Sequence, residues 1–329
     1  MRTIQSYHGQ PVIKQPVWSS EIPCYFFTGG LAGASAGLAY LSGLRGNDTL
    51  ARRAWAMAML GIGASPPLLI ADLGRPLRFI NMLRMVKVTS PMSVGSWILT
   101  ASGATTTLAA ANAWTGLFPR AASFARPAAA AFGLPLSTYT AALIADTAVP
   151  VWHQARGLLP VVYGSGAALS AGGAAVAVTP PAHAAPARRL AIGAALIEIG
   201  AKELMHYRLG EHGEPYKRGA AARLGRFSRA CTLGGAALLY RRGARSRPAA
   251  IAAGALLCAG ALSARFSTFK AGFQSTADPK YAVGPQRAGI DRGERRGAAR
   301  REAEVRTRVS GRDPAPGSPA TAPAELFAS

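Results

Sequence analysis

Uninterrupted stretches without charged residues constrain the fold of this chain more than any other feature of its sequence. Six of them span residues 22–44, 54–71, 88–119, 127–145, 157–187 and 248–264, and the Arg and Lys residues fall between them. Because the hydrocarbon core of a bilayer is about 30 Å thick, an α-helix needs roughly 20 apolar residues to cross it. The runs reach or approach that length, so the sequence predicts an all-α polytopic membrane protein.

The charge of the chain is strongly basic but sparse. The 37 Lys and Arg residues outnumber 15 Asp and Glu residues, yet only 16% of the chain is charged, against about 25% in ordinary soluble domains. A nucleic-acid-binding protein gathers its basic residues on one face of a charged surface. Here they lie between apolar runs, as in the loops of membrane proteins, which favours the lipid bilayer as partner and argues against nucleic acid.

We predict eight membrane helices, with ends good to a few residues, at residues 22–44, 54–73, 92–114, 127–150, 158–179, 187–207, 227–242 and 248–268. Gly and Ala are frequent in all of them, and small residues let helix backbones approach closely in lipid. We therefore expect two four-helix bundles, residues 22–150 and 151–279, after an N-terminal segment, residues 1–21. The basic, Pro/Ala-rich tail, residues 280–329, lacks apolar periodicity and is predicted to be disordered.

Cysteine and histidine usage predicts no metal site in the chain itself. The cysteines Cys24, Cys231 and Cys258 form no C-x-x-C motif of the kind that holds iron–sulfur clusters or c-type haem. Haem held by two histidines would need them on facing helices, and only His153 and His206 approach that arrangement, both at predicted helix ends. A redox role would therefore need electron carriers from outside the chain.

Three titratable residues recur at seven-residue spacing in the predicted helix 127–150 and just beyond it. Tyr139, Asp146 and His153 would lie on one helix face, because seven residues make about two turns. Ionisable groups at membrane depth are costly and therefore point to function. We expect Asp146 to be buried, and a phenol, a carboxyl and an imidazole in one row could bind and protonate a quinone. Alternatively, Asp146 pairs with an arginine and His153 only caps the helix end.

The predicted helix 187–207 carries a second set of charged residues. Glu198, Lys202 and His206 recur every four residues and would share one face, and a Glu four residues before a Lys favours an ion pair. Glu198 lies deepest and is the candidate proton-handling group of this helix. The alternative is that the residues near the helix end are simply solvated.

A charged turn joins the second and third predicted helices. Asp72 ends one helix, Gly74, Arg75 and Pro76 interrupt the chain, and Arg78 follows. Asp72 could be neutralised by either arginine, and the residues after Arg78 suit a short interfacial helix. The turn is either a rigid re-entry loop, or a lid beside a polar pocket, or a dock for a soluble subunit.

The chain resembles the NrfD/PsrC family, which includes the membrane anchor of polysulfide reductase. The similarity rests on "DLGRPLRFINMLR" followed by "SPMSVGSW", on "PVWSSEIPCYFFTGGLAGAS", on "LPLSTYTAALIADTAVPVWHQAR" and on "DPKYAVGPQR". It implies eight helices without haem and a site for exchangeable menaquinone or ubiquinone within the first four helices. It also implies a docked ferredoxin-like subunit with [4Fe–4S] clusters, a molybdopterin catalytic subunit beyond it, and a multi-pass place in the inner (cytoplasmic) cell membrane.

The resemblance assigns Tyr139 as the tyrosine that contacts quinone. Some family members also use an Asn and a His near the start of the first helix, but this chain has neither between Pro11 and Leu44. Glu21 is the nearest titratable residue there and becomes a candidate for quinone binding, together with Asp72, Arg75 and Arg78 at the charged turn.

Two functions of different classes follow. The first is a membrane anchor that exchanges electrons between the quinone pool and an iron–sulfur partner, with Asp146, Glu198 or His153 passing protons. The alternative is a secondary transporter or proton-translocating protein, which the buried charges would fit equally well. A third possibility is an anchor that only tethers its partner and takes no part in quinone chemistry.

Overall fold

The computed structural model describes residues 13–281 except residues 74, 76–77, 85 and 279, and within them the regular structure is entirely helical. Eight helices in this part of the chain have 20 or more residues: α1 (Glu21–Leu44), α2 (Asp48–Asp72), α4 (Pro91–Thr115), α5 (Pro119–Ala145), α7 (Leu159–Val178), α8 (Ala185–Leu209), α10 (Gly219–Arg242) and α11 (Arg247–Ala277). The short elements are α3 (Arg78–Leu83), α6 (Pro150–Gln154), the 3₁₀ turn η1 (Gly210–Gly213) and α9 (Glu214–Lys217).

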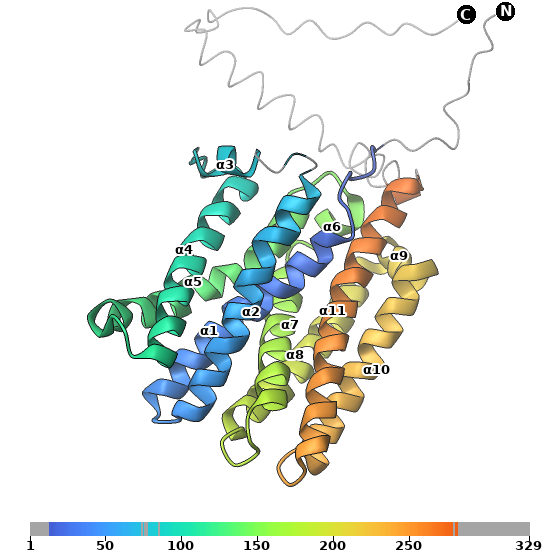
Figure 1. Cartoon of the computed structure of the whole chain (residues 1–329). Helices are drawn as coiled ribbons and strands as arrows, with labels where there is room; N and C mark the ends of the chain where they lie inside the picture. The colour runs from blue at the N-terminus through green and yellow to red at the C-terminus, as the bar shows by residue number, and fades with distance from the viewer. Residues whose placement is uncertain (1–12, 74, 76–77, 85, 279, 282–329) are drawn as a thin grey trace, which may run out of the picture. The chain divides into compact units, whose positions relative to one another are not determined.

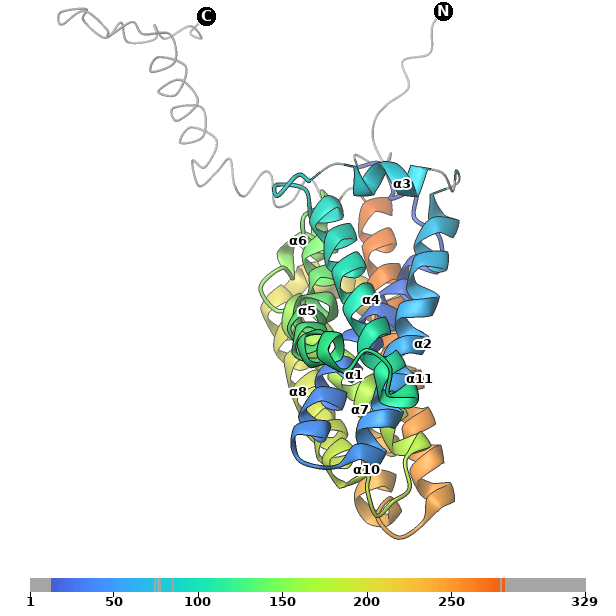
Figure 2. The ribbon, with the colours of Figure 1, turned by 60° about the vertical axis from the view of Figure 1, so that its left-hand side comes forward.

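Most of the long helices run side by side, with α1 and α7 at the centre, while α5 runs obliquely across them (Figures 1 and 2). Helix α1 packs on α2, α5 and α7, while α7 also packs on α8 and α11, and α10 lies on α11. Helices α3, α6 and α9 lie at one end of the long helices, where the described chain also begins and ends (Figure 1). Because α1 and α7 pack together, the described residues up to Tyr281 form one compact unit. The division into two bundles at residue 150 stays a prediction.

Four of the long helices are apolar and long enough to cross a membrane, judged by length and composition over the described residues: α2, α5, α7 and α11. Helices α8 and α10 carry too many charged residues for that criterion, and α1 and α4 are rich in Gly, Ser and Thr. These helices confirm the prediction of a membrane protein with several apolar helices. That all eight long helices cross the membrane is a proposal, to which we return below.

The predicted helix 127–150 is wrong at both ends. Helix α5 begins eight residues earlier, with Pro119 in its first turn, and it ends at Ala145. The chain turns there because the Thr147 hydroxyl donates to Ile144 O at 2.7 Å, and Pro150 starts the separate helix α6. A proline is preorganised for a first helical turn, and the residue before it avoids helical geometry.

Two other long helices begin earlier in the chain than predicted. Helix α2 begins six residues before the predicted position because the Asn47 side chain caps it, accepting from Leu50 N at 3.2 Å. Helix α10 begins at Gly219 rather than at residue 227. A short helix, α3, does follow the charged turn, but it begins at Arg78 and ends at Leu83, so Val86 and Val88, which were expected in it, lie outside it.

A pair of glycines brings α1 and α5 into backbone contact. A methyl group on Gly33 would overlap the carbonyl oxygen of Gly133, and a methyl group on Gly133 would overlap that of Gly33. The helices can approach this closely only because neither residue has a side chain, as the abundance of small residues predicted.

We expect Gly33→Ala to destabilise the protein by about 1–3 kcal/mol, because the added methyl group must push the two backbones apart. The measurement is thermal unfolding of the purified protein in detergent. Gly37→Ala is the matched control, since a methyl group one turn further along α1 meets nothing within 4 Å. Equal stability of both variants would contradict the close contact.

Candidate functional site

A small cavity lies where α2 meets α3, among the first four long helices. Its volume is about 50 Å³, room for a water molecule or two. A cavity known to bind benzene has a volume of about 150 Å³, so we expect a six-membered ring to enter here only if the lining moves. The lining side chains come from the segment before α1 and from α1 to α5: Trp18, Ile22, Tyr25, Leu69, Asp72, Leu73, Met82, Met92, Ser96, Tyr139 and Leu143.

Tyr139 is held in this cavity by a glycine on the neighbouring helix. The tyrosine lies on α5 and is half-buried, and its ring covers Gly95 of α4 so closely that a methyl group there would overlap the ring. This packing fixes the ring plane and leaves the phenol as the polar group that α5 brings to the cavity.

Asp72 also lines the cavity, but its partner differs from the one expected. Its carboxylate accepts hydrogen bonds from Ser19 N at 2.8 Å and Ser19 Oγ at 2.6 Å. Arg75 is exposed and makes no ion pair with Asp72 among the described side chains, while the side chain of Arg78 lies outside the described residues. The carboxylate therefore ties the segment before α1 to the end of α2, and the expected neutralisation by Arg75 is wrong.

Tyr25 is a residue of this site that the sequence interpretation missed. It is 1% exposed, and its hydroxyl has no hydrogen-bond partner in the described part of the chain. A buried polar group without a partner is costly, so this hydroxyl is a donor available to a ligand. The signal in the sequence was weak, because a tyrosine inside "EIPCYFF" is also typical of an apolar helix.

Glu21 does not line the cavity, although its neighbours do. It is the first residue of α1 and is half-buried, whereas Trp18, Ile22 and Tyr25 face the cavity. The structure therefore does not bring Glu21 into the cavity, although it lies one turn before Tyr25.

Asp146 and His153 are not brought to Tyr139 as predicted. Asp146 is exposed and is the residue after the last turn of α5, so its expected burial is wrong. His153 is exposed on α6, where its Nδ1 lies 3.3 Å from Ala145 O and its Nε2 lies 2.7 Å from Arg156 Nη1. The three residues do not form one helical row because the chain turns between α5 and α6.

The neighbouring Trp152 fastens α6 to the remainder of the structure. It is fully buried, its Nε1 donates to Thr268 O at 2.8 Å, and its ring stacks on Trp18 with centroids 5.8 Å apart. The ring also lies directly on Gly272 of α11. Through Trp18, this contact connects the wall of the cavity to the second half of the chain.

The ion pair predicted in α8 is confirmed. Lys202 Nζ lies 2.9 Å from Glu198 Oε1, and the Glu198 side chain is fully buried. Arg265 of α11, a residue that the sequence interpretation missed, is 2% exposed and donates to Tyr163 O at 2.7 Å. A methyl group on Gly166 would lie 3.1 Å from Arg265 Nη2 and 3.2 Å from Glu198 Oε1. The side chains of Arg265 and Glu198 therefore both lie against this glycine.

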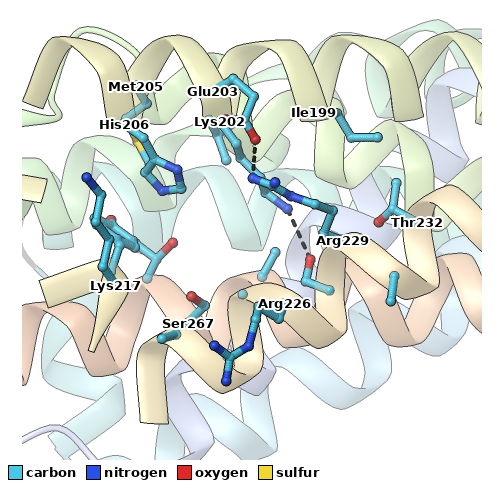
Figure 3. Close-up of a pocket in the computed structure, with 18 of the residues that line it drawn as sticks. Ile199, Lys202, Glu203, Met205, His206, Lys217, Arg226, Arg229, Thr232 and Ser267 are labelled. Atoms are coloured by element: carbon cyan, nitrogen blue, oxygen red, sulfur yellow. Dashed lines mark hydrogen bonds and ion pairs between the residues drawn. The ribbon is translucent and has the colours of Figure 1, made fainter. Parts of the chain in front are cut away.

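A larger crevice opens between α8 and α10, with a volume of about 740 Å³. Lys202 and His206 line it from α8, as expected for residues of one face, and Arg229 lies opposite on α10 (Figure 3). Burial raises the pKa of Tyr216, which lies on α9 at the edge of the crevice. Within the described residues, no three or more His, Cys, Asp or Glu side chains gather as metal ligands would.

Comparison with known protein families gives a match over most of the chain. A family model described as polysulfide reductase, of the NrfD type, matches residues 5–277 and thus covers the whole described helical structure. The search of curated proteins finds no match to the chain.

Proposed function

From the premise that the chain belongs to the NrfD family of polysulfide reductase membrane subunits, we propose that it anchors a redox complex in the cell membrane. In this proposal all eight long helices cross the inner membrane. The chain exchanges electrons between the quinone pool and a ferredoxin-like subunit with [4Fe–4S] clusters, and that subunit passes them to or from a molybdopterin enzyme.

The cavity around Tyr139 supports a quinone site more than any other feature. Two phenols, Tyr25 and Tyr139, and one carboxylate, Asp72, meet there between apolar walls, and the Tyr25 hydroxyl lacks a partner among the described residues. A quinone would supply two carbonyl oxygens that accept hydrogen bonds and take up or release two protons with two electrons. The phenols are donors for such oxygens. The flexible side chains of Met82 and Met92 can move to widen the cavity.

Asp72 is the residue best placed to exchange a proton with the ligand. Its carboxylate lies at the cavity wall and at the end of α2, where the exposed Arg75 follows. A proton accepted there has a short path to water along the segment that contains Ser19. We assign the proton exchange to Asp72 rather than to Asp146, Glu198 or His153, because none of those three residues lines the cavity.

Asp72→Asn should lower quinol-dependent turnover of the purified complex by about 10²-fold, since a positioned proton acceptor contributes at least that much. The asparagine oxygen can still accept from Ser19, so the local structure should be kept. Asp48→Asn, at the exposed opposite end of the same helix, is the control and should retain wild-type turnover. Unchanged activity of Asp72→Asn would remove the carboxylate from the mechanism.

The proposed partners are tested by purification of the intact complex in mild detergent. We expect iron–sulfur subunits to co-purify, quinone to be extracted with organic solvent, and added quinol to change the EPR signals of the clusters. A chain that purifies alone, without clusters or quinone, would contradict the proposed function.

The rival function, transport or proton translocation, is favoured by one observation. The crevice between α8 and α10 reaches Lys202, which is paired with the fully buried Glu198. Reconstituted vesicles separate the two functions: a transporter would carry protons or solute without any electron donor, whereas the proposed anchor would show no flux until quinol and an electron acceptor are present.

A further inference from the structure

The crevice between α8 and α10 must be filled by something when the helices lie in a bilayer. The two helices touch each other little, because α8 packs on α7 and α10 packs on α11. The gap of about 740 Å³ falls within the range of about 300–1,000 Å³ typical of ligand pockets. Unlike the cavity at Tyr139, it needs no rearrangement to admit a bulky group.

The charge inside the crevice is not balanced by the protein. Lys202 is paired with Glu198, and Arg229 is paired with Glu203. Lys217 and Arg226 also line the crevice and have no acidic partner among the described residues. Two cationic groups are therefore left for an anionic ligand, and both are exposed rather than buried against other helices.

The polarity of the crevice changes along its length. Lys217 and His206 lie together at one end, and Ile199 and Thr232 lie at the other (Figure 3). From the start of α10 to Leu233, which is 51% exposed, the wall runs about 20 Å at 1.5 Å per residue. Ala230 and Leu233 line that deeper part. The basic end lies beside α9, at the same end of the long helices as α3 and α6 (Figure 1).

We propose that this crevice binds one anionic phospholipid, with its phosphate between Lys217 and Arg226 and an acyl chain against Ile199 and Leu233. A basic mouth above an apolar groove matches the two ends of such a lipid, and basic pockets between membrane helices are known to hold anionic head groups. A soluble phosphate would use the mouth but leave the apolar part empty. The lipid site is independent of the quinone exchange proposed for the opposite half of the chain.

The site is tested by native mass spectrometry of the full-length protein, purified in mild detergent and titrated with phosphatidylglycerol. One tightly bound phosphatidylglycerol is expected on the wild type, with much weaker binding of phosphatidylcholine. Lys217→Gln combined with Arg226→Gln should weaken binding about 25-fold, since each basic group near a lipid surface is worth about fivefold. Arg223→Gln removes an exposed charge of α10 that does not line the crevice and should bind as the wild type does.

A second variant tests the apolar part without changing any charge. Leu233→Trp should narrow the groove and weaken phosphatidylglycerol binding, while the fluorescence-detected melting temperature stays near that of the wild type. Glycerol 1-phosphate, a soluble anion without acyl chains, is added in a separate experiment to compete with the lipid. The proposal is overturned by wild-type binding in the double variant, by equal binding of both lipids, or by glycerol 1-phosphate displacing the lipid as effectively as phosphatidylglycerol does.

Discussion

Tyr139→Phe is expected to lower quinol-dependent reduction of the partner's clusters by about 10²-fold, the usual cost of one hydrogen-bond donor aimed at a reacting oxygen. The substitution keeps the ring that covers Gly95 and removes only the hydroxyl, so the complex should still assemble. The measurement is stopped-flow reduction of the clusters by added quinol. The effect should fall on the maximal rate more than on the apparent quinol affinity.

Two further variants separate the hydroxyl from its surroundings. Gly95→Ala retains the tyrosine but adds a methyl group where the ring lies, so it should also impair turnover by displacing the phenol. Tyr240→Phe removes a hydroxyl from a residue that is 79% exposed on α10 and should leave the rate unchanged. Wild-type turnover in both Tyr139→Phe and Gly95→Ala would place the quinone elsewhere.

Arg265→Met should cause the largest loss of stability, about 3–5 kcal/mol, because it leaves the carboxylate of Glu198 with less compensation in a dry interior. The substitution also removes the hydrogen bond to Tyr163 O and the guanidinium that lies 3.9 Å from the centroid of the Tyr163 ring. Unfolding in mixed micelles of SDS and mild detergent would measure the change.

The double variant Glu198→Gln with Arg265→Met tests the electrostatic origin of this loss. If the two charges compensate each other across Gly166, removing both should recover much of the stability lost by Arg265→Met alone. Additive losses would show instead that Arg265 acts only through Tyr163. Lys202 keeps a partner in either case, since its Nζ also lies 3.1 Å from Ser228 Oγ.

The sequence predicted interactions within a helix better than those between helices. The spacing of Glu198 and Lys202 was enough to predict their ion pair, because residues four apart lie on one helix face. The same reasoning failed for Tyr139, Asp146 and His153, since it assumed a continuous helix. Thr147 and Pro150 ended that helix and separated the three residues.

Contacts between distant segments could not be foreseen. Ser19 and Asp72 are 53 positions apart, and the hydroxyl of a serine at a helix start carries no signal for a particular carboxylate. Arg265 follows directly on an uncharged run and has no charged neighbour on its own helix at short spacing. Its relation to Glu198 exists only because α8 and α11 both pack on α7.

The sequence alone determined that this chain is a helical membrane protein of the NrfD family, because uncharged runs of membrane length and the motifs around Asp72 and Tyr139 are local properties of the chain. The tertiary structure decided which polar groups share a cavity. It placed Tyr25 in the same cavity as Tyr139, left Asp146 exposed and set Arg265 near Glu198. The physical reason is that helix propensity and hydropathy act over a few turns, whereas burial and charge compensation depend on which helices touch, and paired glycines such as Gly33 and Gly133 set those contacts.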